Sequence, residues 1–220
     1  MGKIELKSKQ LGISLEEIMN MEKQKRVHFI NSLGGFKSVC LIGTQNNHKQ
    51  TNLAIIDSLV HIGSNPPLFG IIFRPAAYER HTLENILETG FYTINHINES
   101  FYKQAHQSSA RYDRATSEFQ AVDLTPEFKN DFFAPFVKES NIQLAMQFKE
   151  KITLSINNTV LIIGEVQKVH YPENCSLADG FLDLEKAGSI TCSGLDSYHK
   201  TSRIDRLNYA KPDKTITSLL

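Results

Sequence analysis

The largest group of residues that could hold a ligand lies within residues 44–82. It includes the stretch TNLAIIDSLVHIGSNPPLFGIIFRP at 51–75, followed after five residues by His-Thr at the start of a predicted helix. Asn52, Asp57 and Ser58 lie in or just after a predicted strand, where polar side chains can face a ligand in a barrel mouth. This composition is typical of a binding segment.

The polar residues that follow have the chemistry of an anion site. Arg74 ends an apolar run just before Pro75, and Arg80 and His81 precede Thr82 at the predicted helix start. The first N–H groups of a helix lack intrahelical acceptors, and a guanidinium forms paired hydrogen bonds with phosphate oxygens. These residues favour phosphate binding. The alternative is that Thr82 only caps its helix and Arg80 is solvated.

Other kinds of catalytic site find little support in the residue spacing. The eight histidines form neither an i, i+4 pair nor a His-x-His pair, so we expect no metal. There is no Gly-x-Ser-x-Gly motif for a nucleophilic serine and no Gly-x-Gly-x-x-Gly motif for a dinucleotide. The sequence therefore identifies no catalytic acid, base or nucleophile.

Composition excludes several classes of partner. The 220 residues include 24 Lys plus Arg and 24 Asp plus Glu, a balance that disfavours nucleic acid. The longest apolar runs, such as Leu68 to Phe73, are too short to span a membrane. Cys40, Cys175 and Cys192 are widely spaced, and the N-terminus has no apolar export signal. We expect a cytoplasmic protein in a reducing compartment.

Hydrophobic periodicity predicts mostly strands. A capping box of Ser14 and Glu17 indicates a helix at 12–22, and Gly90 ends a helix that Thr82 caps at 82–88. A further helical stretch runs up to Gln107. Strands are predicted at 27–33, 36–44, 51–59, 68–74, 91–97, 151–157 and 160–170, with turns at 63–65 and 157–158. Gly164 indicates a bulge or a close approach by another group.

At least six strands with few helices favour a mainly β fold, an antiparallel barrel of Greek-key type, over alternating βαβ units. We expect an N-terminal helical arm at 1–24, a barrel domain at 25–212 and a C-terminal tail at 213–220. Residues 108–138 contain many aromatics with Pro126 and Pro135 as breakers, which predicts an excursion that packs on the barrel.

Taken in order, these segments resemble the flavin reductase-like family of FMN-binding split barrels, in its branch of flavoprotein oxygenases. The matching segments are NSLGGFKSVCLIGT (31–44), TNLAIIDSLVHIGSNPPLFGIIFRP (51–75), RHTLENILETGFYTINHI (80–97) and YHKTSRIDRLNYAKP (198–212). The resemblance covers roughly residues 20–212. It departs from the family where the usual Gly-Asp-His is replaced by Asn157-Asn158-Thr159, which puts in doubt a histidine at the nicotinamide site.

The resemblance implies FMN held in a shallow groove at the interface of a homodimer. Its ring-contacting segment would fall on Asn52, Leu53, Asp57 and Ser58, and its phosphate-holding segment on Arg74, Arg80, His81 and Thr82. Backbone N–H groups near Thr44 and Leu53 would stabilise negative charge on reduced flavin. Tyr198 and His199 would face the flavin or its substrate, the alternative being a surface loop pair.

The implied activity is that of an FMN-binding oxidoreductase, which passes electrons from NADH or NADPH through FMN to an acceptor. One alternative is a non-catalytic FMN carrier or redox-sensing flavoprotein. Another is a barrel that binds a different phosphorylated ligand, such as pyridoxal phosphate, through the same arginine and helix start.

Overall fold

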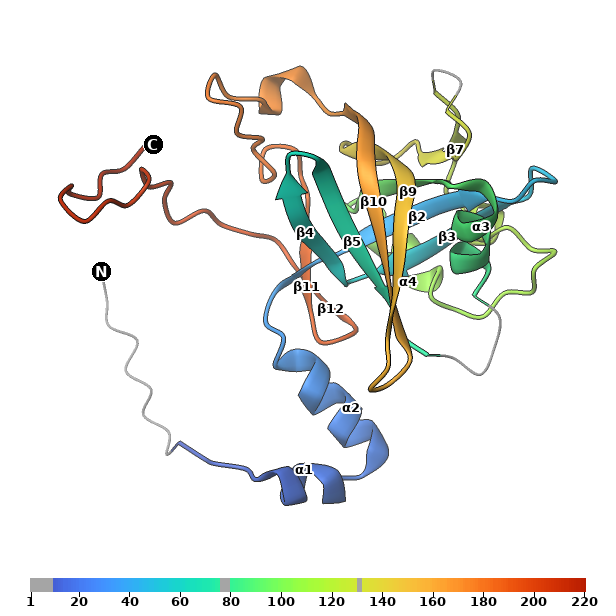
Figure 1. The fold of residues 1–220 in the computed structure, drawn as a ribbon, viewed down its shortest axis with the longest axis horizontal. Coiled ribbons are helices and arrows are strands. Elements are labelled where there is room, and N and C mark those ends of the chain that lie inside the picture. The colour runs from blue at the N-terminus through green and yellow to red at the C-terminus, as the bar shows by residue number, and fades with distance from the viewer. Residues whose placement is uncertain (1–9, 76–79, 130–131) are drawn as a thin grey trace.

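The computed structural model of the protein describes residues 10–75, 80–129 and 132–220. Seven strands form one antiparallel sheet, in the spatial order β3-β2-β6-β9-β10-β5-β4 (Figure 1). They are β2 (Cys40–Gln45), β3 (Thr51–Ile56), β4 (Leu59–Ser64), β5 (Pro67–Phe73), β6 (Phe91–His96), β9 (Gln143–Leu154) and β10 (Thr159–His170). The predicted mainly β, antiparallel class is confirmed.

The sheet curls because its two edge strands are consecutive in the chain. β3 and β4 lie at opposite ends of the strand order, yet only Asp57 and Ser58 separate them. A connection of this length reaches at most ~11 Å, so the two edges must meet at this corner. β6, β9 and β10 are neighbours, and β5 lies beside β10, which is a Greek-key arrangement.

β2 is buried along its whole length because it lies between two hydrophobic cores. Cys40 and Ile42 belong to the core inside the barrel, whereas Val39 and Leu41 belong to a second core on the outer face. Side chains of a strand alternate between faces, which explains why residues 39–42 are apolar without interruption. The prediction of Cys40 as a core residue is confirmed.

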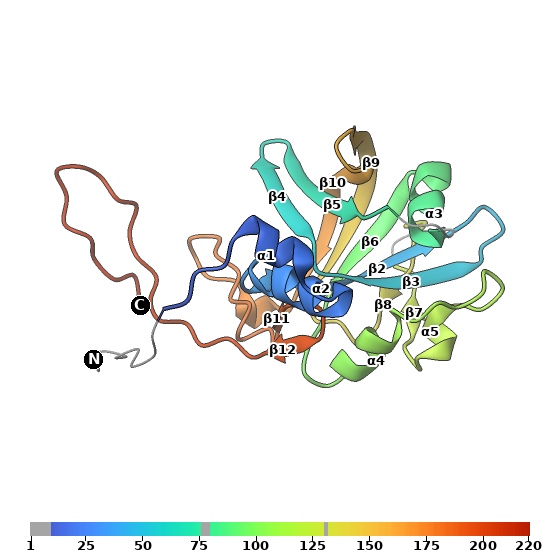
Figure 2. The same cartoon turned by 90° about the horizontal axis from the view of Figure 1, so that it is seen from below.

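The second core lies under the excursion and the segments next to it (Figure 2). Phe101, Phe119 and Val137 are buried there against Leu53 of β3. The elements that bring them are α4 (Tyr102–Gln107), α5 (Glu118–Ala121), β7 (Pro126–Glu127) and β8 (Phe136–Val137). The predicted helix up to Gln107 and the predicted packing of residues 108–138 on the barrel are both confirmed.

Helix α3 (His81–Thr89) packs against β2 and β3. Gly90 ends it in the left-handed conformation, with φ of 78°, as predicted. The prediction that Thr82 caps the helix is wrong. Arg80 is the capping residue and makes no side-chain cap bond, while Thr82 lies inside the first turn and is buried. The hydroxyl of Thr82 accepts a buried hydrogen bond from Asn52 instead of capping the helix.

Two helices precede the barrel, α1 (Leu15–Asn20) and α2 (Lys23–Ser32). The predicted capping box of Ser14 and Glu17 is present in both directions. The predicted strand at 27–33 is wrong, because Glu22 accepts hydrogen bonds from the N–H groups of Gln24 and Lys25 and starts a helix instead. All residues of both helices are exposed or half-buried.

The β9–β10 hairpin is longer than predicted, because β9 begins at Gln143 and not at 151. Its turn is as predicted, with Asn158 at φ 58°. Both predictions for Gly164 are confirmed. The register shifts at this residue, and an added Cβ would collide with the hydroxyl of Tyr92 on β6. Gly164 therefore lets Tyr92 lie fully buried beneath β10.

A small sheet joins the chain ends to the barrel. It consists of β1 (Lys37–Ser38), β11 (Thr191–Ser193) and β12 (Ser197–His199). The short helix η1 (Glu173–Cys175) lies between β10 and β11 in the chain. After β12 an arm runs away from the barrel (Figures 1 and 2). Its two halves pair through Leu207 and Ser218. Among the described residues no helix is long and apolar enough to cross a membrane.

Candidate functional site

Asn52 and Thr82, two of the predicted binding residues, are in direct contact. Asn52 lies on β3 opposite Thr44 of β2, and its Nδ2 donates to Thr82 Oγ1 over 2.8 Å. Both side chains are buried, at 7% and 6% exposure. A buried amide requires a hydrogen-bond partner, so this contact fixes the start of α3 against the barrel.

A second amide, Asn85, lies one turn further along α3 and was not predicted. Its Nδ2 donates to Thr44 Oγ1 over 3.1 Å. Its Oδ1 is buried and has no hydrogen-bond partner among the described residues. A polar residue on the buried face of an amphipathic helix was the sequence signal for it.

The excursion forms the outer wall of the same region. Thr51 Oγ1 and Ser117 Oγ are 2.7 Å apart, and Glu118 Oε2 accepts the N–H of Leu53 over 3.0 Å. Burial raises the pKa of Glu118, which the N–H of Leu53 and the nearby His81 partly oppose. The N–H of Leu53 thus donates to Glu118 in this structure, and the stabilisation of reduced flavin by backbone N–H groups near Thr44 and Leu53 stays a prediction.

These contacts surround a narrow polar recess at the amino end of α3. Its lining residues are Asn46, Gln50, Thr51, Asn52, His81, Asn85, Arg114 and Thr116. The free space is about 10 Å³, which suits about one water molecule. Nearly every lining group is a hydrogen-bond donor or acceptor, and the helix end adds partial positive charge. The recess has the character of a site for a small polar or anionic group.

The two predicted arginines lie at the edge of this region. Arg80 precedes α3, its N–H donates to Glu84 Oε1 over 3.2 Å, and its Nη2 donates to the carbonyl of Arg74 over 3.2 Å. Arg74 is exposed. Glu84 also pairs with Arg114 of the excursion, so the helix start carries a small network of charges.

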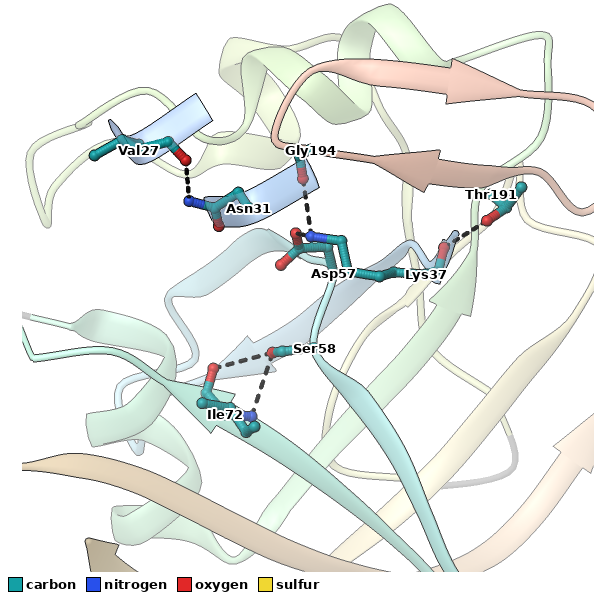
Figure 3. Close-up of polar contacts among 8 residues, drawn as sticks. All are labelled: Val27, Asn31, Lys37, Asp57, Ser58, Ile72, Thr191 and Gly194. Carbon is teal, nitrogen blue, oxygen red and sulfur yellow. Dashed lines mark hydrogen bonds and ion pairs between the residues drawn. The ribbon is translucent and has the colours of Figure 1, made fainter. Parts of the chain in front are cut away.

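A second group of predicted residues lies at the opposite end of β3 (Figure 3). Asp57 pairs with the ammonium of Lys37, which also donates to the carbonyl of Gly194 over 2.8 Å. The carbonyl of Lys37 accepts from Thr191 Oγ1 over 2.7 Å. The Lys37–Asp57 pair therefore joins the β3–β4 corner to the β11–β12 hairpin. Lys37 was not predicted, because the contact depends on residues far apart in sequence.

Ser58 completes the closure of the barrel at this corner. Its Oγ donates to the carbonyl of Ile72 over 3.0 Å and accepts the N–H of Ile72 over 3.3 Å (Figure 3). The hydroxyl thus takes the place of a backbone partner beside β5.

Tyr198 and His199, the predicted substrate-facing pair, lie on β12 beside the Asp57 corner. Tyr198 Oη is 2.8 Å from His106 Nδ1, and burial raises the pKa of Tyr198 to about 12. His199 Nε2 is 2.8 Å from Ser193 Oγ. Both side chains are engaged with their own neighbourhood, and their substrate-facing role stays a prediction.

A larger cleft of about 620 Å³ lies elsewhere, past the far end of β6. None of the residues that line this cleft is among those that line the recess at the start of α3. Glu99, Glu139 and Glu185 line it with a single lysine, Lys200. An acidic lining disfavours a phosphorylated ligand, so size alone does not identify the binding site here. Among the described residues no three His, Cys, Asp or Glu side chains lie together as a metal site would require.

Comparison with known families decides the assignment. The model of the flavin reductase like domain matches residues 36–183, which is most of the barrel and the whole excursion. This chain belongs to the flavin reductase-like family. The match contains both ends of β3 and the start of α3, so the predicted family resemblance is confirmed. A search of curated proteins found no match.

Solved structures of this family have the same fold. A candidate flavin reductase with a split barrel domain from Shewanella frigidimarina NCIMB 400 is 50% identical, with a TM-score of 0.89 over 91% of this chain and 100% of that one. The component B of nitrilotriacetate monooxygenase from Bacillus cereus is 21% identical, with a TM-score of 0.78 over 91% and 100%. Flavoredoxin of Desulfovibrio vulgaris (Miyazaki F) is 22% identical, with a TM-score of 0.67 over 81% and 92%. The split-barrel fold is confirmed.

Proposed function

We propose that this chain binds FMN along β3 and is an NAD(P)H-dependent oxidoreductase, which passes electrons from a nicotinamide through FMN to a separate acceptor. The observation that carries the proposal is the polar recess at the start of α3, next to a family-typical strand. Membership of the flavin reductase-like family supports an oxidoreductase activity.

The residues of the recess fit a phosphate. His81 and Thr82 are the first two residues of α3, so their N–H groups are among those without an intrahelical acceptor. Arg80 adds a guanidinium at the same helix end. The open amide atom of Asn85 calls for one more hydrogen-bond partner. A ligand ending in a phosphate would accept hydrogen bonds from the helix N–H groups and from Arg80, and also from Asn85 when its amide is rotated so that Nδ2 faces the recess.

The opposite end of β3 suits the ring of such a ligand. Asn52 and Asp57 are five residues apart on an extended chain, which corresponds to about 17 Å. An elongated molecule with a phosphate at one end can therefore lie along β3 with its ring near the Lys37–Asp57 pair. There Tyr198 and His199 approach from the β11–β12 hairpin.

FMN supplies the electron-transfer chemistry when it is bound, so the chain does not need its own catalytic acid or base. The residues of the recess bind and orient the phosphate. The Lys37–Asp57 pair holds the β3–β4 corner in place, and the second core under the excursion keeps water from the back of β3. This division agrees with a sequence in which no catalytic group could be identified.

We propose a homodimer on the strength of an outward apolar face of the barrel. Along β5, Ile71 is buried and Ile72 is 36% exposed, so Ile72 points outward. In register beside it are Leu161 and then Ile152. The exposed hydrophobic members of this face are Val60, Ile62, Ile72, Ile152 and Leu154. An exposed apolar face of this extent favours burial against another protein surface, and a second copy of this chain can supply that surface.

The C-terminal arm also supports a second copy. Ile204 is 90% exposed and Tyr209 is 86% exposed, on a segment that extends away from its own barrel (Figure 1). The three cysteines are free and buried, which fits the reducing conditions of the cytoplasm that we propose as the location.

The proposal is tested by the visible spectrum of protein purified without added flavin, followed by anaerobic titration with NADH and NADPH. We expect the two absorption bands of a flavin, and bleaching by one of the two nicotinamides. A flavin spectrum that neither nicotinamide bleaches would instead favour an FMN carrier. A protein that binds no flavin would contradict the proposal.

A further inference from the structure

A negative charge of the protein itself lies beside the recess at the start of α3. Glu84 lies in the first turn of the helix, where its Oε1 accepts the N–H of Arg80 and its Oε2 pairs with Arg114. A carboxylate at a helix amino end is stabilised in the same way as a bound anion. Glu84 therefore makes, within the chain, the contacts that a phosphate would make.

Arg114 reaches this position from the excursion and not from the predicted binding segment at residues 44–82. Gln50 Nε2 donates to its carbonyl, which fixes the backbone of this part of the excursion against the β2–β3 turn. Arg114 lines the recess together with Asn52 and His81. Arg114 is thus placed to reach either Glu84 or a ligand in the recess.

The second observation that points to a ligand is Asn85. Its side chain is 2% exposed and lines the recess, and its Oδ1 has no partner among the described residues. Its other amide atom bonds the hydroxyl of Thr44, which can either donate or accept. If the side-chain amide of Asn85 is rotated by about 180°, the hydroxyl of Thr44 donates to Oδ1 and the two N–H bonds of Nδ2 face the recess. Asn85 can therefore donate to an anion.

We propose that Arg114 is a phosphate ligand of this protein, and that Glu84 holds Arg114 beside the recess until the phosphate displaces it. The ligand class is a phosphomonoester, and within the proposed function, on which this inference rests, it is the 5′-phosphate of FMN. Arg114 must release Glu84 for a phosphate to enter.

Charge and exposure favour this exchange. The side chains of Arg114 and Glu84 are 43% and 41% exposed, and an ion pair in that much water is weak. A phosphate carries about −1.5 to −2 charges at neutral pH and offers three acceptor oxygens, whereas Glu84 offers one charge and two oxygens. The same exposure means that replacing either side chain has little effect on folding.

The test compares the affinities of FMN and riboflavin, measured by quenching of flavin fluorescence, because the two ligands differ only in the phosphate. Arg114→Met is expected to weaken FMN binding about tenfold or more and to leave riboflavin binding unchanged. Glu84→Gln removes the competing charge and is expected to strengthen FMN binding several-fold. Arg111→Met, which removes the same charge three residues away and outside the recess, is the matched control and should change neither.

Three outcomes would overturn the inference. Arg114→Met could leave FMN affinity unchanged, it could weaken both flavins equally as a structural role predicts, or Glu84→Gln could weaken FMN binding. If the wild-type protein binds neither flavin, the proposed function fails independently of this inference. Thermal unfolding with inorganic phosphate then tests whether Arg114 is a phosphate ligand. A phosphate-dependent rise in melting temperature in the wild type but not in Arg114→Met supports the inference, and its absence overturns it.

Discussion

At the scale of single residues, the candidate site depends on buried amides that each need a partner. Asn52 and Asn85 meet the hydroxyls of Thr82 and Thr44, and these four side chains join β2, β3 and α3. Thr44, Asn52 and Thr82 were predicted as binding residues, and the structure brings them together. Asn85 and Arg114 were missed, because their importance comes from where the folded chain places them.

Thr82→Val tests the Asn52–Thr82 contact. Valine has the same shape as threonine but cannot accept a hydrogen bond, so the buried amide of Asn52 would lose its partner. We expect a loss of about 1–3 kcal/mol in the free energy of unfolding, measured by urea denaturation. We also expect weaker FMN binding, because the start of α3 loses its anchor on β3.

Thr89→Val is the matched control on the same helix. The hydroxyl of Thr89 donates to the carbonyl of Asn85, which remains a helix acceptor without it. A smaller loss of stability is expected there. If both valine variants lose the same amount, the Asn52–Thr82 bond has no special role.

At the scale of elements, the strands of the barrel were largely predictable and the exceptions have physical causes. Alternating or β-branched runs predicted β2, β3, β5, β6 and β10. Residues 27–33 also contain β-branched and apolar residues but form a helix, because Glu22 caps the helix that begins at Lys23. β4 was not predicted as a separate strand, because its residues were divided between a predicted strand at 51–59 and a predicted turn at 63–65. Only its pairing with β5 identifies it as a strand.

The end of β6 supplies a prediction about pH. Burial lowers the pKa of His96 from 6.5 to about 4, and its Nδ1 is 3.0 Å from Ser189 Oγ. Between these two values the unfolded chain binds more protons than the folded chain, so stability falls as the pH drops from 6.5 towards 4. At 1.36 kcal/mol per unit, His96 contributes up to about 3 kcal/mol to this fall.

His96→Asn keeps a polar group near the position of Nδ1 but does not titrate in this range. Urea unfolding at several pH values between 4 and 7 should therefore show a shallower loss of stability for His96→Asn than for the wild type. The raised pKa of Glu118 is common to both proteins and cancels in the comparison. Equal slopes would contradict the assignment of the pH dependence to His96.

At the scale of the whole molecule, one barrel has apolar surface on both sides of its sheet. The inner and outer cores account for β2 and β3, but the outward faces of β4, β5, β9 and β10 remain partly exposed. The N-terminal helices and the C-terminal arm likewise lie at the surface (Figures 1 and 2). These features are what a second copy would cover.

Ile72→Glu tests the proposed dimer. A charged side chain in the middle of this outward face would have to be buried against the partner, which is costly without a counter-charge. We expect light scattering to report a dimer for the wild type and a monomer for Ile72→Glu. Leu177→Glu, which changes a residue of similar exposure outside this face, should remain a dimer. A monomeric wild type would contradict the homodimer.

The sequence by itself determined the mainly β class, most strands, the helix that ends at Gly90 and the residues Asn52 and Thr82 that meet beside it. These follow from local patterns, because strand periodicity, turn residues and helix ends depend on near neighbours in the chain. Only the tertiary structure decided that Glu118 and Arg114 belong beside the recess at the start of α3 and that Lys37 belongs at the β3–β4 corner. Each of them reaches its partner across at least 20 residues, through chain closure that no local pattern encodes.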